Sequence, residues 1–137
     1  MGKLMIEITL ILADASTVEN GKLSILGGGW NRIFGSGPHS FAIGALVEVA
    51  LDTDTRDIAG DLRILDRNGN AINGLNGEPM IIPINLHVER PIDPNYNGWV
   101  SAPLAFRFNE LPLAPGIYAI GLAFGEFAAS KSFSVVV

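Results

Sequence analysis

Four aspartates close together in the sequence are the residues best suited to hold a metal ion. Asp52, Asp54, Asp57 and Asp61 fall within one short segment. Calcium takes several oxygen ligands, and carboxylates spaced along a loop supply them. No glutamate follows at the distance that a bidentate ligand requires. A solvated loop between strands explains the same residues, so the loop is the preferred interpretation and Asp52, Asp54 and Asp57 are the alternative metal ligands.

The residues needed for hydrolytic catalysis form no pattern that indicates an active site. His39 and His87 lie far apart in the sequence and show no ligand spacing. Ser36 stands in Gly-Ser-Gly, which lacks the Gly-x-Ser-x-Gly arrangement of a nucleophile elbow. His87 alternates with the apolar Leu86 and Val88, which predicts that it lies on the surface. We therefore predict a protein that is not an enzyme and that holds no cofactor.

Aromatic residues at the borders of loops are the more informative candidates. Trp30 and Trp99 both stand where a loop meets an apolar segment, and Phe34 and Tyr96 lie near them in the sequence. Such rings fill the ends of a core, anchor a protein interface, or stack on a sugar face beside polar side chains. The sequence leaves these three interpretations open.

Three consecutive glycines precede the first tryptophan. A phosphate-binding loop needs a helix after its glycines and a lysine to meet the phosphates, and the segment after Gly27–Gly29 offers neither. A bulge, a corner between two sheets, or a close approach to a neighbouring subunit explains the glycines better. The predicted interface residues are accordingly Trp30, Gly28, Phe34, Trp99 and Tyr96.

The composition indicates an apolar surplus. Of 137 residues, 48% are hydrophobic, 16 are glycine and only 17% are charged, whereas soluble domains carry about 25% charged residues. A small domain leaves much of its surface in water, so the surplus predicts burial against another subunit. The net charge of −5 and the scattered basic residues argue against nucleic-acid binding.

The same composition bears on the location of the protein. The absence of cysteine excludes a disulfide framework and thiolate metal ligands. No apolar run has the length of a membrane span, which predicts no membrane association. The segment 5–10 alternates like a strand rather than forming the core of a signal peptide. We expect a cytoplasmic or virion protein that no classical signal peptide exports.

Alternating apolar residues and turn signals predict an all-β fold for the single domain 1–137. Asn20-Gly21 is typical of a two-residue hairpin turn, and the segments 33–40 and 52–57 are predicted to be irregular. About eight strands separated by turns indicate a two-sheet antiparallel β-sandwich of immunoglobulin-like type. The expected strands cover residues 4–13, 22–26, 41–51, 61–66, 81–89, 100–108, 117–124 and 132–137.

Two motifs carry a resemblance to known proteins. The segment 111–118, Leu-Pro-Leu-Ala-Pro-Gly-Ile-Tyr, resembles the tyrosine corner of immunoglobulin-like sandwiches, in which a tyrosine hydroxyl bonds to upstream backbone. With Leu-Ala-Asp-Ala at 12–15 and Gly-Lys-Leu-Ser-Ile-Leu-Gly-Gly-Gly-Trp at 21–30, it resembles a family of short all-β proteins of unknown function from bacteria and tailed phages. The resemblance implies a compact β-sandwich without assigned catalytic residues.

Together these features predict a binding protein. The expected function is that of a structural or interaction subunit, a homo-oligomer or a component of a larger assembly. The resemblance implies a phage virion protein, such as a capsid or tail decoration or a minor structural subunit. Its partner would be protein, reached through an apolar sheet face and the glycine-rich loop before Trp30. The alternative is a carbohydrate- or small-ligand-binding module that uses Trp30, Trp99 and Tyr96.

Overall fold

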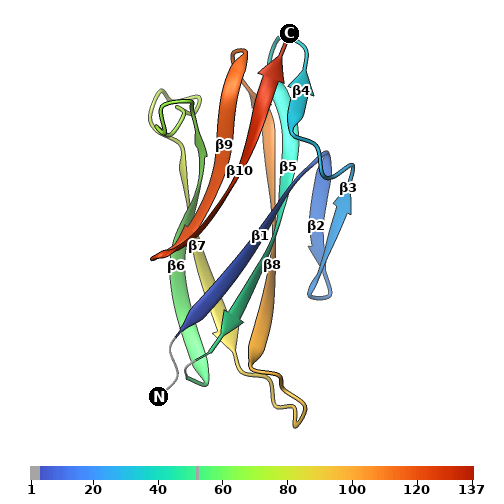
Figure 1. Ribbon diagram of the computed structural model, residues 1–137, viewed down its shortest axis with the longest axis vertical. Coiled ribbons are helices and arrows are strands. Elements are labelled where there is room, and N and C mark those ends of the chain that lie inside the picture. The colour runs from blue at the N-terminus through green and yellow to red at the C-terminus, as the bar shows by residue number, and fades with distance from the viewer. Residues whose placement is uncertain (1–3, 52) are drawn as a thin grey trace.

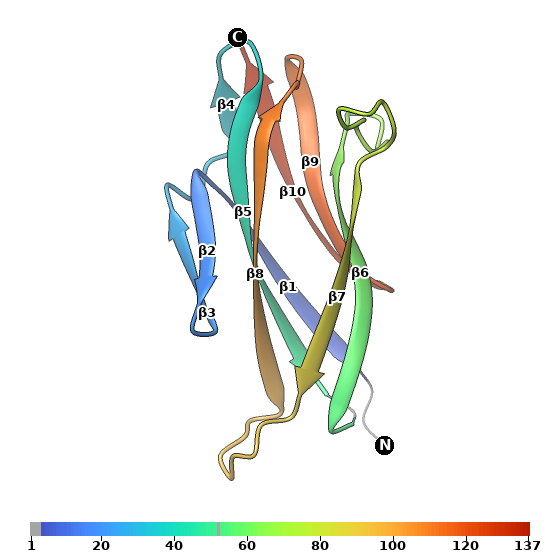
Figure 2. The ribbon, with the colours of Figure 1, turned by 180° about the vertical axis from the view of Figure 1, so that it is seen from behind.

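All regular secondary structure in the described part of the chain is β. The computed structural model describes residues 4–51 and 53–137, shown in Figures 1 and 2. The strands are β1 (Met5–Ala13), β2 (Ala15–Glu19), β3 (Lys22–Leu26), β4 (Arg32–Phe34), β5 (His39–Ala50), β6 (Thr55–Leu65), β7 (Ile81–Glu89), β8 (Trp99–Leu111), β9 (Gly116–Phe124) and β10 (Phe127–Val136). The predicted all-β fold is confirmed.

The strands form three sheets. The first has the order β1-β5-β8, the second has the order β4-β10-β9-β6-β7, and β2 pairs only with β3. The five-stranded sheet is curled, as both ribbon views show. Every pairing is antiparallel except that between β4 and β10, which is parallel. The expectation of a purely antiparallel arrangement is therefore wrong at this edge.

The expected number of about eight strands was too low because two short strands were missed. β4 lies in a glycine-rich segment that was predicted to be a loop, yet its Ile33 pairs with Val135 and packs against the core. β2 carries mostly polar side chains and shows no apolar alternation, and it is held by pairing with β3 across the Asn20-Gly21 turn. β6 begins at Thr55, inside the segment predicted to be irregular.

One hydrophobic core joins the inner faces of the two larger sheets. Alternate residues of each strand point inward, so that Ile120 and Leu122 of β9 and Ile43 and Val47 of β5 are completely buried. Phe41 lies at the centre of an aromatic cluster, in which its ring contacts those of Trp30, Phe108 and Phe133. This cluster fixes the end of the core nearest to β4.

The hairpin of β2 and β3 covers part of the outer face of the three-stranded sheet, beside β5 and β8 in Figure 2. Its Leu23 and Ile25 pack on Gly44 of β5, where an added Cβ atom would lie 2.3 Å from the Ile25 side chain. The Ser16 hydroxyl donates a hydrogen bond of 2.9 Å to the Ile43 carbonyl. β5 is therefore buried on both faces here, which agrees with its nearly continuous apolar sequence.

Candidate functional sites

The outer face of the five-stranded sheet has unusually small side chains at its centre. On β9 the outward positions alternate with the buried Ile120, Leu122 and Phe124. The register places the outward residues of β10 beside them. We call this surface the small-residue face, and its members on the two strands are Ala119, Gly121, Ala123, Ala128, Ser130, Ser132 and Ser134.

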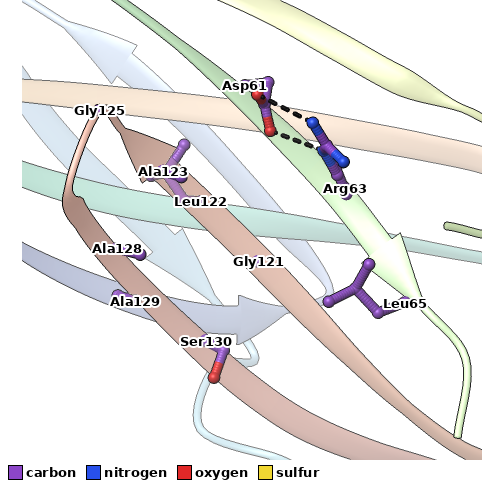
Figure 3. Close-up of a pocket in the computed structure, with 10 residues that line it drawn as sticks. All are labelled: Asp61, Arg63, Leu65, Gly121, Leu122, Ala123, Gly125, Ala128, Ala129 and Ser130. Carbon is purple, nitrogen blue, oxygen red and sulfur yellow. Dashed lines mark hydrogen bonds and ion pairs between the residues drawn. The ribbon is translucent and has the colours of Figure 1, made fainter. Parts of the chain in front are cut away.

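A shallow pocket of about 500 Å³ lies on this face, over β9 and between β6 and β10, as Figure 3 shows. Gly121 and Ala123 form its floor, and Asp61 and Arg63 stand on the neighbouring strand β6. The guanidinium of Arg63 donates two hydrogen bonds to the Asp61 carboxylate, of 2.9 and 3.3 Å. These bonds raise the pKa of Arg63 above its ordinary value. The pocket therefore combines an apolar floor with one positive and one negative group.

Large apolar side chains are exposed at one end of the small-residue face. Phe34 is 71% exposed, and its register partner Val136 is 37% exposed. Ile117 of β9 is 54% exposed and stands opposite Ser134, two residues along β10 from Val136. Three neighbouring strands thus present apolar side chains to solvent near the C-terminal end marked in Figure 1.

A second pocket, of about 300 Å³, lies at the same end of the molecule. We call it the Trp30 pocket. It is formed where the end of β1, the glycine-rich loop, β4 and the start of β5 meet. Its lining residues include Asp14, Trp30, Arg32, Phe34, Ser40 and Phe41.

Of the three interpretations offered for the glycine-rich loop, the structure shows a corner between two sheets. It connects β3 of the hairpin to β4 of the five-stranded sheet. Gly29 has a φ angle of 93°, which other residues adopt with strain. A Cβ atom at Gly28 would lie 2.5 Å from the Ile25 side chain, so this predicted interface residue makes a close approach within its own chain.

The predicted aromatic residues form two separate groups. Trp30 contacts Phe41 at the start of β5, with the ring centroids 5.8 Å apart, whereas Trp99 pairs with Ala50 at the other end of that strand. Tyr96 lies on the loop before Trp99, with the Arg90 guanidinium 5.9 Å from its ring. A single platform made of Trp30, Trp99 and Tyr96 is therefore not formed within one copy of the chain.

The acidic residues predicted as alternative metal ligands make other contacts. Asp52 lies outside the described residues. Asp54 forms an ion pair with Arg90 at 3.3 Å, and Asp57 contacts His87. Within residues 4–51 and 53–137, no group of three histidine, aspartate or glutamate side chains is arranged to hold a metal ion.

His87 is exposed, as its place in the alternating strand predicted, but its partners were not foreseen. Its Nδ1 lies 2.7 Å from Asp57 on β6, and its Nε2 lies 3.0 Å from Glu89 on β7. The hydrogen bond with Asp57, followed by that with Glu89, raises the pKa of His87 above its ordinary value. With both ring nitrogens bonded to carboxylates, neither is placed to take a proton from a nucleophile.

The Asp57–His87 contact depends on the pairing of β6 with β7 and not on local spacing. In the sequence, the signal for this contact is that Asp57, His87 and Glu89 all occupy outward positions of their strands.

Among the described residues, no helix is long and apolar enough to cross a membrane.

Comparison with known proteins assigns no family to the chain. No protein-family model matches it, and no curated protein matches it. A solved structure of a family 123 glycoside hydrolase from Clostridium perfringens, described for glycolipid glycan hydrolysis, is similar over 98% of this chain and 27% of its own, with a TM-score of 0.44 and 14% sequence identity. The chain thus spans about a quarter of that protein, and a similarity of this size assigns neither a fold family nor an activity.

Proposed function

We propose that the protein is a non-enzymatic structural subunit that associates with a second copy of itself through the small-residue face. The observation that carries the proposal is the composition of this face. The outward positions 119–123 of β9 and 128–134 of β10 carry only alanine, glycine and serine, and the exposed apolar side chains of Phe34, Ile117 and Val136 lie at one end. Side chains this small allow another sheet to approach the face closely.

The charges on the face favour a second copy as the partner. Asp61 and Arg63 stand side by side next to the pocket. A surface that carries adjacent groups of opposite sign is complementary to itself when rotated about a two-fold axis. In such a dimer, Arg63 of each copy faces Asp61 of the other, and the apolar floor of the pocket is removed from water.

Two narrower parts of the proposal concern the fold and the biological setting. The fold is an immunoglobulin-like two-sheet sandwich, with the parallel β4–β10 pair as its exception. The Tyr118 hydroxyl supports this assignment, because it donates a hydrogen bond of 2.7 Å to the Ala114 carbonyl, as in a tyrosine corner. The setting is the cytoplasm or a phage virion, as a capsid or tail decoration or minor structural protein, which the sequence resemblance supports.

The test is the native mass of the purified protein, measured by light scattering after size exclusion across a dilution series. We expect a dimer at micromolar concentration that dissociates on dilution. The Ala123→Glu variant places a carboxylate on the pocket floor beside Asp61 and is expected to be monomeric, because an unpaired buried charge is costly.

The matched control is Leu75→Glu. Leu75 is an apolar residue that is 90% exposed and lies between β6 and β7, outside the small-residue face. This control introduces the same charge and should leave the dimer intact. A monomeric wild-type protein throughout the micromolar range would overturn the proposal, and so would an unchanged dimer in Ala123→Glu.

A further inference from the structure

Two oppositely charged side chains in the Trp30 pocket have no partner. Asp14 and Arg32 both line the pocket, and neither side chain makes a hydrogen bond or ion pair in the described part of the chain. Ser40 also lines it, and its hydroxyl oxygen accepts a bond from the Glu110 N–H at 2.9 Å, which leaves the hydroxyl proton available. The pocket thus offers one strong acceptor and two donors to a ligand.

Aromatic rings complete the pocket. Phe34 is 71% exposed, and Trp30 is half-buried with its edge against Phe41 at an interplanar angle of 80°. The Trp30 indole Nε1–H is buried and has no acceptor. Among the described residues, the ring is therefore held by packing against Phe41 and the core and not by a hydrogen bond.

The chemistry of these groups narrows the class of ligand. A wholly apolar molecule would bury Asp14 and Arg32 without partners, at a large cost in desolvation. A phosphorylated ligand would meet one arginine beside an aspartate on a protein with a net charge of −5. A neutral pyranose satisfies both constraints, because each hydroxyl both donates and accepts a hydrogen bond and its C–H face packs on an aromatic ring.

We infer that the Trp30 pocket binds a neutral saccharide. The ring of the sugar packs on Phe34 and Trp30, and neighbouring hydroxyls bond to Asp14, Arg32 and Ser40. A volume of about 300 Å³ is that of a small ligand site and accommodates a single sugar residue of a longer glycan. The polar groups Asp14, Arg32 and Ser40 lie outside the pocket over β9, and Phe34 is the ring that this site shares with the end of the proposed dimer face.

The two tryptophans provide an internal control for the test. The protein contains two tryptophans, and Trp99 lies at the far end of β5 from Trp30. The ¹⁵N-labelled full chain is titrated with methyl glycosides of glucose, galactose and mannose and with N-acetylglucosamine, and the two indole N–H signals are followed by NMR. The Trp99→Phe variant assigns the signals. We expect at least one sugar to shift the Trp30 signal in a saturable way at millimolar concentration, while the Trp99 signal stays in place.

Two variants separate recognition from a structural effect. Arg32→Met removes the guanidinium and keeps most of the side-chain length, and it is expected to weaken binding at least tenfold, since it leaves a ligand hydroxyl unpaired. Arg67→Met is the matched control, because Arg67 lines a different pocket beside Tyr118. The inference is overturned if no sugar of the panel moves the Trp30 signal selectively, or if Arg32→Met binds as tightly as Arg67→Met. Neither result bears on the dimer, which the mass of Ala123→Glu tests separately.

Discussion

The outer faces of the two larger sheets each carry a glycine in a central strand, but the surroundings of the two glycines differ. Around Gly44, the outer face of the three-stranded sheet is covered by the chain's own β2–β3 hairpin. Around Gly121, the outer face of the five-stranded sheet carries an open pocket, and an added Cβ atom would meet only Leu65 at 3.7 Å. Small outward residues thus accompany a covered face in one sheet and an uncovered face in the other.

The difference shows what a small outward residue indicates. Gly44 is needed because the hairpin approaches β5 closely, whereas no residue in 4–51 or 53–137 approaches Gly121 so closely. The exposed large apolar residues at the end of the small-residue face make it an apolar patch in contact with water, and such patches commonly mark interaction sites. The comparison therefore favours a partner outside the chain for the second face.

The largest expected loss of stability comes from adding a side chain at Gly44, between β5 and the β2–β3 hairpin. Gly44→Val places a branched side chain where Ile25 and Leu23 already lie, and it should destabilise the protein by about 1–3 kcal/mol. The measurement is denaturant unfolding at a concentration at which the protein is monomeric.

Gly121→Val is the matched substitution on the uncovered face. The Cβ atom added at Gly121 would lie at an ordinary contact distance from Leu65, and valine favours a strand, so the stability of the monomer should not fall. Equal losses of stability in the two variants would contradict this difference between the faces, because they would show that both glycines have a close neighbour.

A smaller effect is expected from the hydroxyl that ties the hairpin to β5. Ser16→Ala removes the hydrogen bond to the Ile43 carbonyl and should cost about 1 kcal/mol. Amide hydrogen exchange should increase first in β2 and β3, because a two-stranded hairpin is barely stable without support. Ser130→Ala on the small-residue face is the control and should be neutral, since the Ser130 hydroxyl has no hydrogen-bond partner in the described chain. Slower exchange or no change in the hairpin would show that packing alone holds it.

The sequence predicted the strands that alternate cleanly and missed those that do not. β7 was predicted with its observed bounds because Ile84, Leu86 and Val88 face the core at every second position. β4 was missed because its pairing with β10 depends on contacts with the far end of the chain. The parallel direction of that pair is likewise a property of the tertiary fold and leaves no local pattern.

The candidate sites were less predictable than the strands. Phe34 was noted as near Trp30 in the sequence, and both line the Trp30 pocket, but Trp99 was grouped with them although it lies at the other end of β5. Asp14 and Arg32 carry no motif of their own and become a pair only around the Trp30 pocket. Nothing in the spacing of Asp61 and Arg63 indicated that the small residues of β9 and β10 would lie beside them.

The smallest expected effect concerns His87, on the strand β7 at the edge of the five-stranded sheet. His87 lies there between Asp57 and Glu89, and these carboxylates raise its pKa above the ordinary value of about 6.5. Because the folded state holds the proton more tightly, the contribution to stability is complete below the ordinary pKa and is lost as the pH rises through the raised pKa. Full exposure to solvent keeps this contribution small.

An NMR titration of the His87 ring measures the shift directly. Asp57→Asn should lower the pKa of His87 more than Glu89→Gln does, because the hydrogen bond with Asp57 is the larger cause. The melting temperature of the wild type, relative to His87→Asn, should fall slightly between neutral and alkaline pH. An unshifted pKa would mean that these carboxylates do not bond to the His87 ring. The ring would then be mostly uncharged at neutral pH, and the two carboxylates would leave more net negative charge at this edge to oppose self-association.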